Sequence, residues 1–209
     1  KARRLQALHT RRRDLLLAID KRLDSEQCEE EKHDESWLWA GVKALREMKK
    51  EAPQGLKGRE RTAWARNRRE SRLNEHLEAI DTMLRPGVRL SVVNDRGELR
   101  VLANKVPLIE GVFLDEADAD FIAAQWRHKT RQTNVTEKFD AKRLVNLLLK
   151  LRKTTNEAIK AQVLKLDADV QSLDREIAEA EEDLNRLTYR LYGLTEEEIR
   201  LVEAEGSVV

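Results

Sequence analysis

Six arginines between positions 59 and 72 are the most distinctive group of side chains in this 209-residue chain. They are Arg59, Arg61, Arg66, Arg68, Arg69 and Arg72. A guanidinium group binds a phosphate or a guanine edge through two parallel hydrogen bonds. Because the six groups would project all round a helix, we expect this helix to lie along the phosphate backbone of double-stranded DNA. The alternative is a solvent-exposed helix whose arginines pair with Glu60, Glu70 and other acidic neighbours, which charge runs more often signify.

A second candidate for DNA contact runs from position 125 to position 134 and is rich in amide and cationic side chains. Its candidate contact residues are Gln125, Arg127, His128, Lys129, Arg131, Gln132 and Asn134. Amide and guanidinium groups are the side chains that read base edges in a groove. The stretch is predicted to pass from a helix into a loop, which suits entry into a groove. The alternative is an ordinary polar loop.

The sequence lacks the residues that methylation of a base would require. An exocyclic-amine methylase needs a glycine-rich turn for S-adenosylmethionine and an Asn/Asp-Pro-Pro-aromatic loop for the flipped base. No Gly-x-Gly occurs here, and Pro53, Pro86 and Pro107 stand alone. We therefore predict no catalytic residue and no bound cofactor on this chain.

Nuclease and metal chemistry are equally poorly supported. The triplets Glu30-Glu31-Lys32 and Glu47-Met48-Lys49 match the letters of a metal-dependent nuclease. With 38% of the residues charged, such triplets arise by chance, and we expect both to be solvated surface. The four histidines are widely separated, and none pairs with Cys28 at the spacing of metal ligands. We predict no metal site.

The composition favours a slender helical protein in a reducing compartment. Only 4% of the residues are aromatic, which argues against a broad sandwich or barrel. The single cysteine, Cys28, cannot form an internal disulfide, so we expect a cytoplasmic location. No apolar run approaches the ~20 residues of a membrane span, and we expect no membrane partner. Because Lys1 falls inside a helical pattern, we expect the chain to be part of a longer polypeptide.

Charge is strongly segregated behind a net charge of +1. Residues 43–72 carry eleven Lys/Arg against four Asp/Glu, and residues 127–165 carry eleven against three. Residues 167–205 reverse the balance, with four basic against thirteen acidic side chains. The segregation has two interpretations. Either two basic faces bind a polyanion while the acidic region is kept away from it, or the basic and acidic faces pair inside the fold.

The element that organises the chain is a long helix near its C-terminus. Between positions 159 and 194 apolar residues recur at alternating intervals of four and three, the spacing of a helix that packs along a narrow seam. Gly193 is predicted to end the helix in the left-handed conformation. Thr195 and Glu198 then form a capping box that starts a short last helix.

This C-terminal stretch resembles a known family. Residues 191–199 read Leu-Tyr-Gly-Leu-Thr-Glu-Glu-Glu-Ile, which is similar to the C-terminal end of N6-adenine DNA methylases of restriction–modification systems, including type IIG enzymes. The likeness is strong over 173–203, thinner back to 111, and does not reach the first 90 residues. It implies a target-recognition and helical region, with S-adenosylmethionine and the catalytic motifs on a methylase domain upstream or on a partner chain.

The remaining elements complete a mainly α fold, a long helical hairpin or coiled-coil bundle with one small antiparallel β-sheet inserted. We expect helices at 5–23, 36–48 and 59–84, and an acidic loop at 24–35. A four-residue turn at 94–97 should join strands 88–93 and 98–102, with a third strand at 112–114. Helices should follow Asp115 and Asp140, separated by an irregular segment at 129–137. A turn at 154–157 should then create an αα-hairpin with the long helix; the alternative antiparallel partner is the first helix.

Three domains follow from this pattern: a basic helical region at 1–87, a β-hairpin with a helix and polar loop at 88–139, and an αα-hairpin with a short last helix at 140–209. We expect DNA binding and target recognition without catalysis on this chain. The alternative function is a coiled-coil module that docks a protein or forms a homodimer through its acidic C-terminal helix.

Overall fold

The computed structural model of the chain describes residues 1–39 and 41–206 and divides into two compact units. The first unit comprises Lys1–Cys28 and Thr154–Val209, and the second comprises Glu29–Lys153. The expected mainly α fold with a small antiparallel sheet is confirmed. The three predicted domains are replaced by this division, in which one unit is inserted into the sequence of the other.

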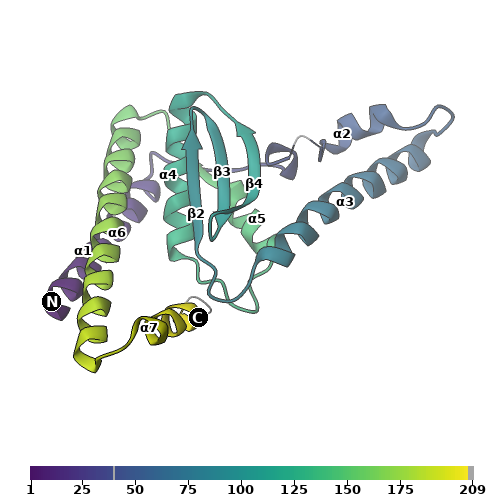
Figure 1. The fold of residues 1–209 in the computed structure, drawn as a ribbon. Helices are drawn as coiled ribbons and strands as arrows, with labels where there is room; N and C mark the ends of the chain where they lie inside the picture. The colour runs from purple at the N-terminus through teal and green to yellow at the C-terminus, as the bar shows by residue number, and fades with distance from the viewer. Residues whose placement is uncertain (40, 207–209) are drawn as a thin grey trace. The chain divides into compact units, whose positions relative to one another are not determined.

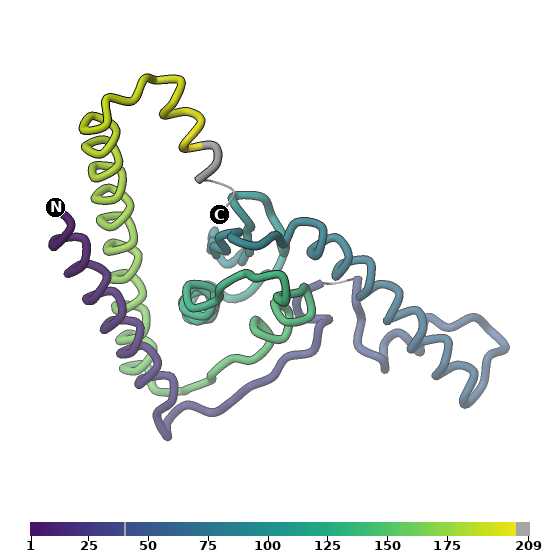
Figure 2. Tube along the Cα trace, turned by 90° about the horizontal axis from the view of Figure 1, so that it is seen from below, coloured from purple at the N-terminus to yellow at the C-terminus, as the bar shows by residue number. Residues whose placement is uncertain are grey.

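The first unit is built on two paired helices. Helix α1 (Ala2–Leu23) lies along α6 (Glu157–Tyr192), and Figure 2 shows the two side by side. Arg12 Nε lies 2.6 Å from Asp174 Oδ1, and Lys1 Nζ lies 3.2 Å from Asp183 Oδ2, so the helices run antiparallel. Their buried apolar residues are Leu16, Ile19 and Leu23 on α1 and Ile159, Val163, Val170, Leu173 and Ile177 on α6. The basic helix therefore pairs with the acidic one, as the sequence suggested.

Local capping signals define both ends of α6. Asn156 Oδ1 accepts from the backbone N–H groups of Ala158 and Ile159 at 3.0 and 3.3 Å. At the other end Gly193 adopts φ 64° and ψ 30°, and Leu194 N–H donates to the Tyr189 carbonyl at 3.0 Å. The predicted left-handed C-cap is confirmed.

The predicted capping box opens helix α7 (Glu196–Gly206). Thr195 N–H donates to Glu198 Oε2 at 2.8 Å, and Glu198 N–H donates to Thr195 Oγ1 at 3.3 Å. Hydrogen bonds from the Thr195 backbone and hydroxyl lower the pKa of Glu198. The short last helix therefore begins where the sequence indicated.

The second unit contains a three-stranded antiparallel meander of β2 (Leu90–Asp95), β3 (Glu98–Ala103) and β4 (Val106–Phe113). Helix α4 (Glu116–Gln132) covers one face of this sheet, and α5 (Ala141–Leu149) lies beside it (Figure 1). The core lies between the sheet and these helices, with Trp126 and Leu144 fully buried at its centre.

The turn between β2 and β3 is tighter than expected. Asp95 pairs with Glu98, so only Arg96 and Gly97 form the loop, with φ angles of 52° and 91°. Positive φ at both central residues suits the twist of a two-residue hairpin. A Cβ on Gly97 would lie 2.5 Å from the Leu114 carbonyl oxygen, so glycine is also required sterically.

The expected αα-hairpin ending at 154–157 is wrong. Helix α5 ends at Leu149 and continues as strand β5 (Lys150–Lys153), which pairs antiparallel with β1 (Glu29–Lys32). Helix α6 begins at Glu157 and packs on α1. The expected acidic loop at 24–35 is likewise wrong for residues 29–32, because β1 finds its hydrogen-bonding partner in a distant part of the sequence.

The remaining helices form a projection from the second unit. Among the described residues of the expected helix at 36–48, which exclude residue 40, the structure has only short elements, η1 (Glu35–Trp37) and α2 (Leu45–Met48), and η2 (Lys49–Glu51) follows them. Helix α3 (Gly58–Met83) matches the prediction, and Figure 1 shows it extending away from the sheet with α2 alongside. We call α2, η2 and α3 together the arm. Within the described residues, no helix is long and apolar enough to cross a bilayer.

Candidate nucleic-acid interface

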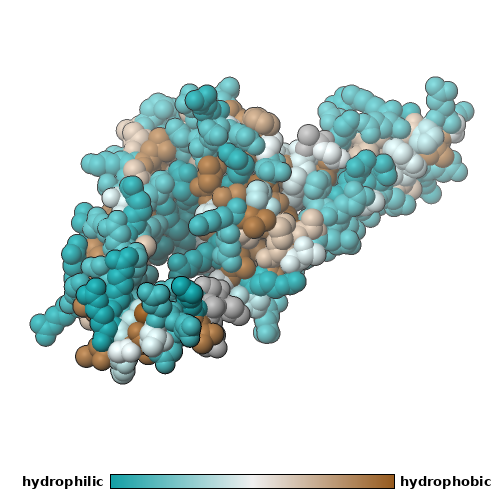
Figure 3. Space-filling view, viewed as in Figure 1, coloured by the Kyte–Doolittle hydropathy of each residue, from teal (hydrophilic) through white to brown (hydrophobic). Residues whose placement is uncertain are grey.

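The arm presents the arginine cluster on the N-terminal half of α3. The C-terminal half of α3 enters the core through Leu77 and Ile80. The N-terminal half packs against α2 and η2 and buries Ala65. Figure 3 shows that the visible surface of the arm is largely hydrophilic. The cluster is therefore held on a supported helix at the exposed end of the unit.

Arg69 differs from the other five arginines. Its Nη2 lies 2.7 Å from Asp34 Oδ2 and 2.6 Å from Glu35 Oε2, and its side chain is only 18% exposed. Burial acts to raise the pKa of Asp34, but hydrogen bonds from Ser36 and Arg69 outweigh it and lower that pKa. The expectation that guanidinium groups project all round α3 is thus wrong on this side. Here Arg69 binds the helix to Asp34 and to Glu35, at the start of η1.

The other arginines line the two flanks of α3. Residues seven apart differ by only about 20° round a helix. Arg61, Arg68 and Arg72 therefore share one flank, and Arg59 and Arg66 share the other, all five being exposed. Arg72 Nη1 lies 3.9 Å from Glu75 Oε2. In the part of the chain that the structure describes, no carboxylate lies within 4.0 Å of the guanidinium nitrogens of the other four.

The second candidate stretch lies mostly on a helix, because α4 continues to Gln132 instead of ending before 129. Its inner side binds the main chain around the end of α5. Gln125 Nε2 donates to the Arg152 carbonyl at 2.9 Å, and Gln125 Oε1 accepts from Arg152 N–H at 2.7 Å. Trp126 Nε1 donates to the Leu148 carbonyl at 2.9 Å. The buried Gln125 amide is therefore engaged inside the fold.

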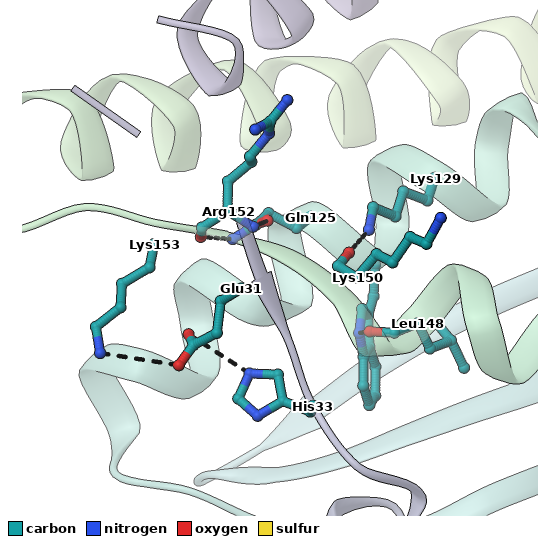
Figure 4. A network of polar contacts seen from close by, with 9 residues as sticks. Glu31, His33, Gln125, Lys129, Leu148, Lys150, Arg152 and Lys153 are labelled. Carbon is teal, nitrogen blue, oxygen red and sulfur yellow. Dashed lines mark hydrogen bonds and ion pairs between the residues drawn. The ribbon is translucent and has the colours of Figure 1, made fainter. Parts of the chain in front are cut away.

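Lys129 belongs to the same network, shown in Figure 4. Its Nζ donates to the carbonyls of Leu147, at 3.0 Å, and of Lys150, the C-cap residue of α5. Burial, together with the nearby positive charges of Arg152 and Lys150, lowers the pKa of Lys129 to about 8. Lys129 thus stabilises a helix end, and its ammonium group points at protein carbonyls.

The other members of this stretch have polar contacts of their own. Arg127, His128, Arg131 and Gln132 all take part in polar or electrostatic interactions within the chain. One of these joins Gln132 Nε2 to His128 Nε2 at 3.3 Å. Asn134 is exposed beyond the end of α4. Figures 1 and 2 place the N-terminal half of α3 away from α4, so the two stretches do not form one surface.

The triplet Glu30-Glu31-Lys32 lies on strand β1, where the sequence predicted a loop. Glu31 is shared between Lys153, at 3.8 Å, and His33, at 3.5 Å (Figure 4). Across residues 1–39 and 41–206, no three His, Cys, Asp or Glu side chains are grouped so as to hold a metal ion. The carboxylate of Glu31 is engaged with an ion-pair partner, Lys153.

Sequence reasoning overlooked the outer face of α3, between the two arginine flanks. This face carries the exposed residues Ala63, Asn67 and Ser71, each four positions after the last, and the exposed Glu60 and Glu70 lie on the same side. Ala65 and Arg69 point inward, and this face lies on the opposite side of the helix. A helical wheel would have revealed this face if Ala65 had been assigned to the buried side of the helix. The spacing of the arginines instead indicated guanidinium groups on every side, so no buried side was assigned. Comparisons with protein families, curated proteins and solved structures find no significant match to this chain.

Proposed function

We propose that this chain is the DNA-binding and scaffold portion of a restriction–modification N6-adenine methylase and that the arm contacts duplex DNA. The observation that carries the DNA contact is the flank of α3 formed by Arg61, Arg68 and Arg72. Its side chains are exposed, and Arg61 and Arg68 have no carboxylate partner among the described residues. Arginines of this kind bind phosphates and release condensed counterions.

The assignment to the methylase class rests on the resemblance at the end of α6. In this proposal the S-adenosylmethionine and the catalytic residues belong to a methylase domain upstream or to a partner chain. The paired helices α1 and α6 form the scaffold of this proposal, α6 alone being roughly 54 Å long at about 1.5 Å per residue. The single buried thiol of Cys28 fits the reducing environment of the cytoplasm.

The test is the salt dependence of DNA binding by the 209-residue chain. Affinity for a duplex of arbitrary sequence is measured at several salt concentrations for the wild type and for R61Q/R68Q/R72Q. The proposal requires wild-type binding that weakens with salt and a variant that binds less tightly with a shallower slope. Equal affinity and slope in the two proteins would reject the arm as a DNA-binding element.

A second candidate function, self-association through α6, has its own observation. Helix α1 begins near Asp183 of α6, and beyond that point Leu187, Leu191 and Tyr192 are 42%, 81% and 73% exposed. Leu191 continues the four-three spacing of apolar residues on α6, and α1 packs against the earlier residues of that series. A second copy of this chain would supply a matching segment, because an antiparallel pair of identical helix ends brings the same leucines together. A concentration-dependent dimer would support this function.

A further inference from the structure

The outer face of α3 has the form of a helix surface that faces a groove. Ala63, Asn67 and Ser71 are exposed and lie within about two turns, on the side opposite the buried Ala65. All three side chains are short. Asn67 makes no side-chain hydrogen bond to any part of the chain that the structure describes. Its amide therefore stands at the centre of the face with its donor and acceptor both available.

Cationic flanks border this face on both sides. Arg59 and Arg66 line one edge, and Arg61, Arg68 and Arg72 line the other. A helix with its side chains measures about 10–12 Å across, and the major groove of B-form DNA is about 12 Å wide. If the outer face entered the groove, each flank would meet the phosphates of one strand. This arrangement explains why arginines lie on both flanks. Contact with the phosphates of a single strand would need arginines on only one flank.

We propose that the N-terminal half of α3 lies in the major groove of duplex DNA and that Asn67 reads an adenine there. The inference rests on the proposed function and adds the mode of recognition. An asparagine amide forms two hydrogen bonds with adenine, accepting from N6 and donating to N7. Ala63 and Ser71, one turn to either side, leave room for the base edge. A-form RNA does not fit, because its major groove is too narrow for side chains to read.

The same helix explains why reading stops after about two turns. Beyond Arg72 the exposed charged residues of α3 are acidic, namely Glu75, Glu78 and Asp81. No lysine or arginine follows Arg72 on α3, so these carboxylates repel phosphates without compensation, whereas five exposed arginines outnumber Glu60 and Glu70 in the N-terminal half; the C-terminal half therefore stays outside the groove. It also contains Asn74, which is exposed, has no side-chain hydrogen bond within the described chain, and lies seven positions from Asn67. Asn74 is therefore a matched control of the same residue type on the same helix.

The experiment selects duplexes from a library with a randomised core of about 10 base pairs, one turn of DNA. The wild-type 209-residue chain should enrich sequences with adenine at one position. Affinity is then compared between the enriched duplex and the same duplex with that A·T pair changed to G·C. The wild type and Asn74→Ala should prefer adenine by about 5- to 150-fold, the range of one bidentate contact. Asn67→Ala should lose the preference while binding both duplexes as a non-specific ligand does.

The outcomes separate this inference from the proposed function. Loss of adenine preference in Asn67→Ala alone supports groove reading. Salt-dependent binding with no enriched sequence, or enrichment that Asn67→Ala retains, overturns the reading by Asn67 and leaves the arm as a phosphate-binding element. An absence of any duplex binding overturns both. Because Asn67 is exposed and alanine favours helices, the variant should melt like the wild type, so a lost preference is not a loss of fold.

Discussion

The side chain of Gln125 binds both main-chain polar groups of Arg152. Its Nε2 donates to the carbonyl at 2.9 Å, and its Oε1 accepts from the N–H at 2.7 Å. Arg152 lies opposite Glu30 in the two-stranded sheet, and its N–H and C=O point away from β1. One amide on α4 therefore takes the place of a third strand at the free edge of β5, where backbone groups would otherwise lack a protein partner.

Replacing Gln125 with leucine should destabilise the second unit. The variant leaves the Arg152 N–H and carbonyl without their partner, and each buried unsatisfied group costs about 1–3 kcal/mol. Urea denaturation should show a lower free energy of unfolding. The control is Gln162→Leu, at an exposed position of α6, which should differ little from the wild type. Equal stability of the two variants would mean that solvent satisfies Arg152 as well as Gln125 does.

The low pKa of Lys129 predicts how pH affects stability. Burial and the charges of Arg152 and Lys150 lower its pKa to about 8 in the folded chain, whereas the ordinary value is 10.5. Between these values the unfolded chain binds more protons, so stability gains from this group as pH rises from about 8 to 10.5. Below pH 8 both states are protonated, and the full penalty for burying the charge remains.

The measurement for Lys129 is the difference in unfolding free energy between the wild type and Lys129→Gln as a function of pH. The difference should move in favour of the wild type between about pH 8 and pH 10.5 and stay flat just below pH 8. The exposed Lys142→Gln serves as the control and should show no such step. A flat difference across the whole range would mean that Lys129 titrates as a solvated lysine.

For the arm, R61Q/R68Q/R72Q should weaken DNA binding across all sequences. Each lost phosphate contact should reduce the slope of log affinity against log salt by roughly one, so the triple variant should lose up to about three. The matched control removes the same charge elsewhere, at Arg3, Arg11 and Arg13 of α1, which are exposed. If the slope of log affinity against log salt fell as much in the α1 variant, the effect would be due to the change in net charge and not to contacts made by the arm.

The C-cap of α6 should be sensitive to a β-branched residue. Gly193→Val forces valine to a φ near 64°, costing on the order of 1–2 kcal/mol, while no atom lies close enough for its Cβ to clash. Hydrogen exchange at Leu194 N–H should accelerate, and Gly193→Asn should do so less. Leu191 and Tyr192 are exposed, so melting of the rest of the chain should be unchanged.

Self-association is tested at Leu191. Sedimentation of the wild type should show a dimer that grows with concentration, and Leu191→Lys should remain monomeric because a charge replaces the apolar contact. Leu17→Lys changes another exposed leucine, on α1, and should associate like the wild type. A wild type that stays monomeric at every concentration would remove the second candidate function.

The sequence alone determined those features whose signals are local. The four-three spacing, Gly193 and the Thr195–Glu198 box lie within or beside α6, and the structure places the C-terminal end of α6 and the start of α7 accordingly. The β-hairpin followed from the glycine at position 97 between two apolar runs. Such signals work because a cap or a turn is satisfied by residues only a few positions away.

Only the tertiary structure decided how distant segments pair. Residues 29–32 read as an acidic loop until β5 supplies their hydrogen bonds, and β5 in turn depends on Gln125. Arg69 was one of six equivalent arginines in the sequence, but Asp34 and Glu35 draw it inward and leave the others outside. These choices depend on partners far along the chain. Local pattern cannot identify such partners, because the gain from pairing exists only once the fold has brought them together.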